Sequence, residues 1–586
     1  MNSRNQILDL FKGIAIVAVI LYHAGLFTYG YLGVEIFLVI GGYLITKSIM
    51  RSYEKGCFNY WDYLCKRLVR LWPLALLITV VSLAAGYFTM LPDVYKNTCE
   101  TAVGTSFFIN NFVQYITAGN YWDASNDFKP LMHTWYLGVI FQFYVLYPLL
   151  FMLCRQFTKK YIKTSRGLLW GIFGCSLLFY MLPSTDTPVA FYLLPARLYE
   201  FAAGGLIALY GTEKYKTRNT RATLFTLLFL VAILLFINFD YDAAKVRLLL
   251  TVALSSVIIL FSEQQQKEQE IDHSWYSKLL SVFIPLGIAS YSLYLWHQLI
   301  LAFYRNIISD ELSAGAYLLT IFISIAIGYL SYLGIEKTIA AYTKQSKVHT
   351  YTVLSVCVLL TCAIAAFSVK YYKTQGVVRD IPELEVYTND PQSWEPQEYN
   401  ARITSLYEKP FPKKNGKKNV LVVGDSFARD WINVLLESHI KDVNLIYSKD
   451  IAKDLRKKIS QADIIFVANN APIDKYVDYL PAMLEKKFYR VGHKTFGRGI
   501  SSAYNQAILT GNYVQAAPPI DDKINIDEQV EFKGKYINLM DSLQNKDGSI
   551  NLFTQDKLLI SHDGIHLTRA GAKQYAKLIN VNNLIR

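Results

Sequence analysis

The stretch Asn419–Trp431, NVLVVGDSFARDW, joins a strand-like apolar run to a helix-prone segment through a short turn. The turn consists of Gly424, Asp425 and Ser426. A serine placed between the carboxyl end of a strand and the start of a helix is typical of a hydrolase nucleophile. The stretch therefore predicts an α/β domain with a reactive serine, although residues 1–371 are mostly apolar.

Composition indicates a membrane protein. The 586 residues are 53% hydrophobic and 18% charged, which is more apolar than a soluble chain of this length. The net charge of +13 comes from basic residues scattered between apolar runs. This pattern favours loops at a membrane surface, so we expect a lipid bilayer and no nucleic acid as partners.

The apolar runs predict about eleven membrane-spanning helices, because each run is close to the ~20 residues that cross a bilayer. The expected spans are residues 7–27, 33–50, 72–92, 134–154, 167–184, 188–210, 222–238, 244–262, 280–304, 314–335 and 351–371.

Alternate loops differ in charge, which predicts their side of the membrane. Basic residues gather near 47–70, 155–166, 214–221 and 337–347, whereas 28–32 and 93–133 are poor in them. Basic loops face the cytoplasm. An odd number of spans that starts inside then places the C-terminus outside, in the periplasm, for a multi-pass protein of the bacterial inner membrane.

Three parts follow from this reading: a transmembrane domain at 1–371, a linker at 372–416 and a small domain at 417–586. The linker contains five prolines among polar residues. In the last part, apolar runs alternate with helix-like segments, which predicts an α/β domain with a parallel sheet.

Near the C-terminus, Asp563 and His566 lie three residues apart in a loop before a helix. A serine hydroxyl needs a base to accept its proton, and the base needs a partner that fixes its tautomer. Ser426, His566 and Asp563 could fill these roles. Taken alone, Gly-Asp-Ser is more often a simple turn and Asp-x-x-His a simple helix start, but their combination in one small domain favours a catalytic site.

Acyl transfer also needs donors for a developing oxyanion. The backbone amide of Ser426 is one candidate. The other is a side chain at the end of the strand-like ADIIFVA, either Asn469 or Asn470, although an asparagine there is also a common turn residue.

GDSFARD, followed much later by DGIHLTRAGA, resembles the SGNH/GDSL hydrolase family. The resemblance implies a three-layer α/β fold over 417–586, with Ser426, Asp563 and His566 as its triad. The glycine that this family adds to the oxyanion hole has no clear counterpart in the sequence.

The apolar part resembles a second family, acyltransferase 3. Its motifs include LDLFKGIAIVAVILYH, KRLVRLWPL, PLMHTWYLGVIFQFYVLYP and LGIASYSLYLWHQLIL. The resemblance implies transfer of an acyl group from cytoplasmic acyl-CoA, most simply acetyl-CoA, with the CoA ester as substrate and no resident cofactor. Some members carry an SGNH domain at their C-terminus.

Lys12 and His23 are eleven residues apart, so on a helix they differ by about 20° around the axis and by roughly 16 Å along it. Ionisable residues inside a span usually have a function. Alternatively, Lys12 extends to the membrane surface and His23 bonds to a neighbouring helix. The resemblance implies that His23 is the acyl-transfer base and Lys12 its basic partner.

Other polar residues of the apolar part could support this chemistry. Glu35 is expected level with His23 and could orient it. Arg67 and Arg70 resemble the family's Arg-x-x-Arg motif for CoA phosphates, although a solvated cytoplasmic loop would explain them equally well.

Three further polar residues lie within predicted spans: Arg197, Glu200 and His297. They could line the acyl path or pair with one another as structural contacts. Relatives usually carry two acidic residues where this chain has Ile140 and Phe141, which predicts altered donor chemistry if the acidic pair takes part.

The combined reading predicts a membrane O-acetyltransferase. Acetyl from acetyl-CoA would pass to Ser426 and then to a hydroxyl of a surface glycan, such as the O-antigen of lipopolysaccharide. Peptidoglycan O-acetylation is an alternative, and a membrane-tethered esterase or a non-enzymatic transporter would be alternatives of another class. No metal is expected.

Overall fold

The computed structural model describes residues 5–117, 126–158, 160–182, 187–210, 220–237, 244–268, 276–390, 396–413, 415–517 and 523–586. The basic loop predicted around 214–221 lies mostly outside these residues. The chain forms two compact units. Unit 1 comprises residues 1–86, 97–303 and 312–372, and unit 2 comprises 87–96, 304–311 and 373–586.

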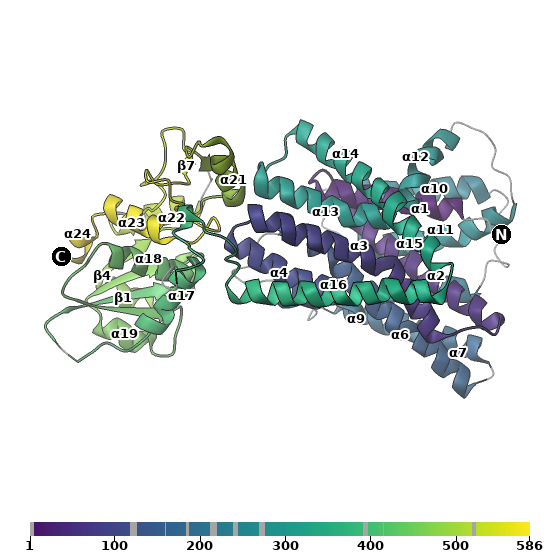
Figure 1. Cartoon of the computed structure of the whole chain (residues 1–586). Helices are drawn as coiled ribbons and strands as arrows, with labels where there is room; N and C mark the ends of the chain where they lie inside the picture. Colours follow the sequence, from purple (N-terminus) through teal and green to yellow (C-terminus); the bar gives the residue numbers. More distant parts are fainter. Residues whose placement is uncertain are drawn as a thin grey trace. The chain divides into compact units, whose positions relative to one another are not determined.

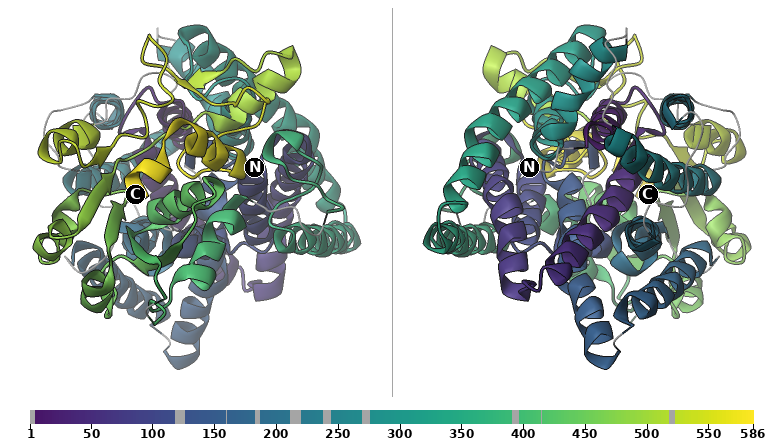
Figure 2. Two further views of the ribbon diagram at one scale, coloured as in Figure 1. Left: turned by 90° about the vertical axis from the view of Figure 1, so that its left-hand side faces the viewer. Right: turned by 90° about the vertical axis from the view of Figure 1, so that its right-hand side faces the viewer.

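Unit 1 is built of helices (Figure 1), and four of them, α3, α4, α13 and α16, also include one or more residues that are assigned to unit 2. Their bounds are α1 Gln6–His23, α2 Gly33–Glu54, α3 Tyr60–Thr89, α4 Pro92–Ser106, α5 Asn110–Thr117, α6 Trp135–Phe157, α7 Tyr161–Met181, α8 Thr187–Tyr192, α9 Leu194–Tyr210, α10 Thr220–Phe236, α11 Ala244–Glu268, α12 Tyr276–Ile288, α13 Ser290–Ile307, α14 Ala314–Ser331, α15 Lys337–Thr343 and α16 Lys347–Lys373. Figure 2 shows them from two further directions, with α16 seen nearly end-on.

Seven helical stretches among the described residues are long and apolar enough to cross a bilayer, or eight if the bent pair Val282–Ile288 and Ser290–Ile307 is one span. The protein is therefore a multi-pass membrane protein, but the prediction of eleven spans is not confirmed. The spans predicted at 167–184, 188–210 and 222–238 fall short of this criterion. Arg166 shortens the apolar run of α7, α9 has only 17 residues, and α10 is of the same length.

Small residues let the helices of unit 1 approach closely. A Cβ atom on Gly42 of α2 would lie 2.0 Å from the carbonyl oxygen of Phe201 in α9, and one on Gly204 would lie 1.9 Å from that of Val39. No larger side chain fits at either position. Because lipid tails are as apolar as the side chains, such backbone proximity is a main source of helix association in membranes.

Unit 2 contains a five-stranded parallel sheet in the order β2-β1-β3-β4-β6. Two of its strands, β1 and β4, are labelled in Figure 1. The strands are β1 Lys418–Gly424, β2 Val443–Lys449, β3 Ile464–Ala468, β4 Lys487–Val491 and β6 Tyr536–Ile537. A separate antiparallel pair joins β5 Ala516–Ala517 to β7 Ile550–Asn551. The helices are α17 Pro396–Tyr407, α18 Ser426–Glu437, α19 Leu455–Gln461, α20 Leu480–Leu484, α21 Ile500–Thr510, α22 Lys523–Glu531, α23 Arg569–Leu578 and α24 Val581–Ile585.

The sheet is buried on both faces, as its apolar strands require. Side chains alternate along β1, so Val420 and Val422 pack in a core with α18 and α23, whereas Leu421 and Val423 pack in a second core with α19 and α20. Unit 2 therefore has three layers, helix, sheet and helix. This arrangement confirms the predicted parallel α/β architecture.

The segment predicted as a linker contributes to the first of these cores. Helix α17 lies within it, and Tyr399 and Ile403, one turn apart, are buried against α18. Residues 391–395 and 414 of this segment lie outside the described residues. Among the described prolines, Pro382 begins a short 3-10 helix and Pro396 begins α17.

Candidate active sites

Ser426 lies where β1 passes into α18. Asp425 caps the helix, since its Oδ1 accepts a hydrogen bond from the Phe427 amide at 2.9 Å. Gly424 has φ +144°, and a Cβ there would lie 1.8 Å from the carbonyl oxygen of Ala468. Only glycine fits this position. The turn thus presents a serine, 2% exposed, at the first residue of a helix.

The structure brings together the three side chains predicted as a triad. His566 Nε2 lies 2.9 Å from Ser426 Oγ, and His566 Nδ1 lies 2.5 Å from Asp563 Oδ2. A carboxylate can only accept, so Nδ1 carries the proton and Nε2 is left to accept the serine proton. This is the geometry of a serine nucleophile, its general base and an orienting acid.

Asp563 is held in its ionised form. Burial raises the pKa of its carboxyl, but the nearby His562 and His566 and the hydrogen bonds from His566 outweigh burial and hold the pKa well below its ordinary value. Its Oδ1 also accepts from the backbone amides of Ile565 and His566 at 2.9 and 2.8 Å. The carboxylate therefore fixes both the loop and the imidazole.

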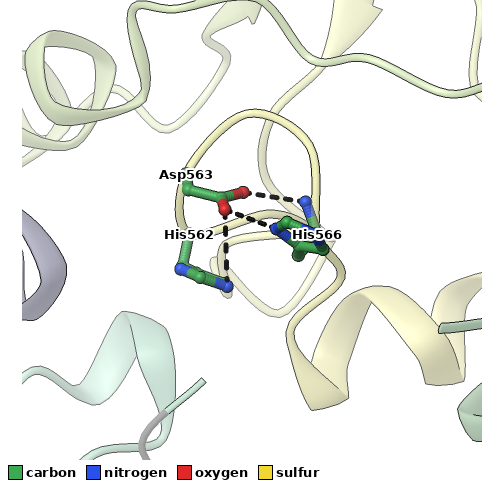
Figure 3. Close-up of side chains that lie close together, drawn as sticks. All are labelled: His562, Asp563 and His566. Atoms are coloured by element: carbon green, nitrogen blue, oxygen red, sulfur yellow. Dashed lines mark hydrogen bonds and ion pairs between the residues drawn. The ribbon is translucent and has the colours of Figure 1, made fainter. Parts of the chain in front are cut away.

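His562 stands beside this pair (Figure 3). Its Nε2 lies 4.0 Å from Asp563 Oδ2, and its Nδ1 contacts the carboxylate of Asp93, which belongs to the same unit. Among the described residues, His562, Asp563 and His566 form a group whose ligand atoms lie within 4.8 Å of one another, close enough for a metal. Both ring nitrogens of His566 are already engaged by Asp563 and Ser426, so the arrangement suits proton transfer better.

The two asparagines proposed for the oxyanion hole differ in their surroundings. Asn470 is exposed, its amide nitrogen donates to Asp425 at 2.9 Å, and its side-chain oxygen lies 2.5 Å from His493 Nε2. Asn469 is 1% exposed, and in the described part of the chain its side-chain nitrogen and oxygen have no hydrogen-bond partner. A buried amide without a partner is costly, which makes Asn469 the better candidate donor.

Glu35 and Arg197 form a buried ion pair in unit 1. Arg197 Nη1 lies 2.8 Å from both carboxylate oxygens of Glu35 and 3.2 Å from Glu200 Oε1, and none of the three residues is more than 2% exposed. The structure thus gives Glu35 an arginine partner, which the sequence reading did not foresee. The Glu35–Arg197 ion pair joins α2 to α9. Arg197 and Glu200 therefore make a structural contact, and they also lie near the cavity described next.

His23 and Glu35 line one cavity of about 560 Å³, the histidine cavity, together with Tyr22, Asp127, Trp135 and Tyr294. Three imidazole rings gather beside it. His23 and His297 have ring centroids 5.1 Å apart, and His133 and His297 have theirs 5.4 Å apart. His133 lies inside the PLMHTWYLGV motif but was not predicted as a site residue. A histidine within such an apolar stretch is itself a signal of a functional role.

A second cavity of about 960 Å³, the basic cavity, is lined by several cationic side chains: Lys12, Lys66, Arg70, Lys337, Lys344 and Lys347. The acidic Asp62 and Glu336 also line it, and Asp62 pairs with Lys347. Lys12 contacts Asp9 at 3.2 Å. A small third cavity of about 150 Å³, the linking cavity, shares Lys12 and Arg70 with the basic cavity and Tyr294 with the histidine cavity. The three cavities therefore adjoin in series. Lys12 lines the basic and linking cavities, whereas His23 lines the histidine cavity.

The remaining predicted residues lie around the linking cavity. Arg67 lines it and stacks over the rings of Tyr63 and Tyr144 at 5.2 and 5.6 Å. Ile140 also lines it, whereas Phe141 stacks on Phe108 with centroids 4.6 Å apart. At the two positions where the resemblance leads one to expect acids, the chain has apolar packing.

Residues 5–333 match the family model described as an acyltransferase domain. The chain is 27% identical over 351 residues to a protein of Staphylococcus aureus (strain COL) provisionally named O-acetyltransferase SACOL0978, covering 56% of each chain. It is 29% identical over 315 residues to the peptidoglycan O-acetyltransferase OatA of Listeria monocytogenes, covering 50% of this chain and 48% of that protein.

A third relative is a protein of Komagataeibacter xylinus provisionally named membrane-bound transacylase BcsY. It is 26% identical over 356 residues, which cover 59% of this chain and 86% of the relative. The chain spans about half the length of the Staphylococcus and Listeria relatives that it matches. No solved structure matches the chain.

Proposed function

The chain belongs to the acyltransferase 3 family, and from this premise we propose that it is an O-acetyltransferase that modifies a cell-surface polysaccharide. Acetyl-CoA in the cytoplasm is the donor, and Ser426 carries the acetyl group on the other side of the membrane. The observation that carries the proposal is that one chain joins an acyltransferase domain to a unit with the Ser426, His566 and Asp563 geometry.

The cavities of unit 1 support the donor half of the proposal. The basic residues around Lys12 and Arg70 suit the phosphates of CoA, because cationic side chains bind phosphate oxygens through charge-assisted hydrogen bonds. The acetyl thioester would extend through the linking cavity towards the histidines. There His23, with His133 and His297 nearby, would act as the base of the first transfer.

Unit 2 supports the acceptor half, and we assign it an SGNH-type fold and role. His566 Nε2 takes the proton of Ser426 as Oγ attacks the carbonyl of the acyl donor. The bond between the acyl carbon and its carrier atom breaks, His566 gives the proton to that leaving atom, and the acyl group becomes an ester of Ser426. A sugar hydroxyl then attacks this ester and gives its proton to His566. The sugar O-acetyl product leaves and Ser426 recovers its proton. Asn469 and the Ser426 amide would stabilise both oxyanions.

The acceptor is proposed as the O-antigen of lipopolysaccharide. Peptidoglycan is a second candidate, because a relative of the acyltransferase part is named a peptidoglycan O-acetyltransferase. NMR of purified lipopolysaccharide and of peptidoglycan, from a deletion strain complemented with the wild type or with Ser426→Ala, tests both. Loss of O-acetyl groups from one fraction identifies the acceptor, and unchanged O-acetyl content in every surface glycan contradicts the function.

Location is a separate part of the proposal. Unit 2 must face the periplasm if Ser426 serves an acceptor outside an inner membrane, as the charges of the loops indicate. A C-terminal alkaline phosphatase fusion should then be active in cells. An inactive phosphatase fusion beside an active cytoplasmic reporter at the same site would contradict the transfer of acetyl across the membrane.

A further inference from the structure

A buried ion pair stands behind the triad of unit 2. Lys494, in the loop after β4, lies 2.8 Å from Asp430 Oδ2 in α18, and both side chains are 1% exposed. A buried ion pair is not in itself a strong source of stability, because both charges lose their hydration. The contacts that this pair makes with the backbone around it therefore matter more than its own contribution to stability.

The pair holds the backbone on both sides of the catalytic base. Lys494 Nζ donates to the carbonyl oxygen of Ile565 at 2.8 Å. The amide of Leu567 donates to Asp430 Oδ2 at 3.1 Å. Ile565 and Leu567 are the two neighbours of His566, so one ion pair fixes the peptide before and the peptide after the imidazole.

The same pair is tied to the nucleophile. Asp430 lies one helical turn after Ser426 in α18. Asn400 Nδ2 donates to Asp430 Oδ1 at 2.6 Å and to the carbonyl oxygen of Ser426 at 3.0 Å. Lys494 also lies 3.8 Å from the ring centroid of Phe427, the residue after the serine. The contacts thus connect the serine helix directly to the histidine loop.

We propose that Lys494 and Asp430 are positioning residues that set the distance between Ser426 and His566. This inference rests on the proposed function, because it presumes that the triad is catalytic. Neither side chain contacts the reacting atoms; both act through the backbone around His566. Catalysis is sensitive to errors of a fraction of an ångström in such constellations, so release of the histidine loop should affect the turnover rate before it affects binding.

The experiment measures cleavage of 4-nitrophenyl acetate by the full-length protein in detergent. Lys494→Met should lower kcat by about 100-fold while KM changes less than about threefold. Lys494→Arg keeps the charge and a donor and should recover most of the lost kcat. Lys458→Met is the matched control, because Lys458 is also buried in unit 2 but pairs with Asp454 and the carbonyl oxygen of Tyr447.

A merely structural role would give a different pattern. Lys494→Met would then lower Tm and the active fraction as Lys458→Met does, while the kcat of the folded fraction, titrated with a serine-reactive phosphonate, stays at the wild-type value. That result overturns the inference. If Lys494→Met does not fold, Asp430→Asn decides, because a folded Asp430→Asn protein with the wild-type kcat would also overturn the inference. Full ester cleavage by Ser426→Ala would instead contradict the proposed function.

Discussion

His566 Nε2 lies 2.9 Å from Ser426 Oγ, although 140 residues separate the two in the sequence. The parallel sheet makes this contact possible, because β1 delivers the serine to the carboxyl edge of the sheet and the loop before α23 returns to the same edge. The distance suits direct proton transfer from the hydroxyl to the imidazole.

Removal of single triad members should give an ordered series of effects on ester cleavage by the full-length protein. Ser426→Ala and His566→Ala lose the nucleophile or the base, so we expect kcat to fall by at least about 10⁴-fold. Asp563→Asn should cost somewhat less, on the order of 10²- to 10⁴-fold, because the aspartate orients the imidazole and stabilises its charge. Steady-state rates with an activated acetate ester check the order.

The combined variants supply the control for this series. Because the three residues act as one unit, the triple variant should be scarcely slower than Ser426→Ala alone. An Asp563→Asn protein as active as the wild type would remove Asp563 from the triad. Effects that simply multiply would show that the three side chains act independently.

Asp563 should also make the stability of the protein depend on pH. Its carboxyl has a lowered pKa when folded, so the folded state binds fewer protons than the unfolded state near pH 4. The stabilisation is present above the unfolded pKa of about 3.9 and is lost as pH falls below it. The Tm difference between the wild type and Asp563→Asn should therefore be largest near pH 7 and shrink towards pH 3.

Asp380 provides the comparison for that measurement. Its pKa is also lowered, mainly by hydrogen bonds from Thr388, but it is exposed, and no histidine contributes to the lowering. Asp380→Asn should change Tm little at any pH. A Tm difference for Asp563→Asn that stays constant from pH 7 to pH 3 would show that the ionised carboxylate does not stabilise the fold.

Removal of the arginine alone from the buried Glu35–Arg197 pair should destabilise unit 1. Arg197→Met leaves two buried carboxylates, Glu35 and Glu200, without their cation, and breaking such a pair costs about 3–5 kcal/mol. Glu35→Gln keeps a hydrogen-bond acceptor and should cost less. Thermal unfolding in detergent, followed by loss of the monodisperse fraction, measures both effects.

An exposed ion pair of the same unit serves as the control. Lys347 contacts Asp62 at 2.9 Å, with side chains 74% and 39% exposed, and such pairs contribute little. Lys347→Met should leave Tm nearly unchanged. Equal losses for Arg197→Met and Lys347→Met would mean that burial of the Glu35 pair is not what stabilises the helices.

Gly424→Ala should abolish ester cleavage, although this substitution removes no polar group of the site. The added methyl would meet the carbonyl oxygen of Ala468 at 1.8 Å, and φ +144° is strained for alanine, so β1 and the serine turn must shift. Gly416→Ala is the matched variant, since its φ is also positive, +77°, but a Cβ there has nothing within 4 Å. Wild-type kcat in Gly424→Ala would show that the turn tolerates the shift.

Local motifs made much of unit 2 predictable. Three features depend only on the backbone conformation of a few neighbouring residues: the continuous apolar run NVLVV, the glycine before Asp425 and the Asp563-x-x-His566 spacing. The sequence also placed two asparagines at the end of β3. It could not decide between them, because the choice depends on burial: Asn469 faces the interior, whereas Asn470 is exposed.

Side-chain contacts between residues from distant parts of the chain could not be predicted from the sequence. Arg197 and Glu35 are 162 residues apart, and no periodicity connects them. Lys494 occurs in a loop where a lysine usually faces solvent, so its burial against Asp430 had no signal. The prediction of eleven spans is not confirmed for another reason: α9 and α10 have 17 residues each, one fewer than the length criterion requires.

The most direct test of the central claim is to find the acetyl group on Ser426. Inside-out membrane vesicles that contain the protein are given isotope-labelled acetyl-CoA, and the peptide that contains Ser426 is analysed by mass spectrometry. Labelled acetyl on Ser426 in the wild type, absent in His23→Ala although that variant still cleaves an activated acetate ester, is the predicted result. Equal labelling in His23→Ala, or labelled glycan produced by Ser426→Ala, would contradict the transfer of acetyl through this serine.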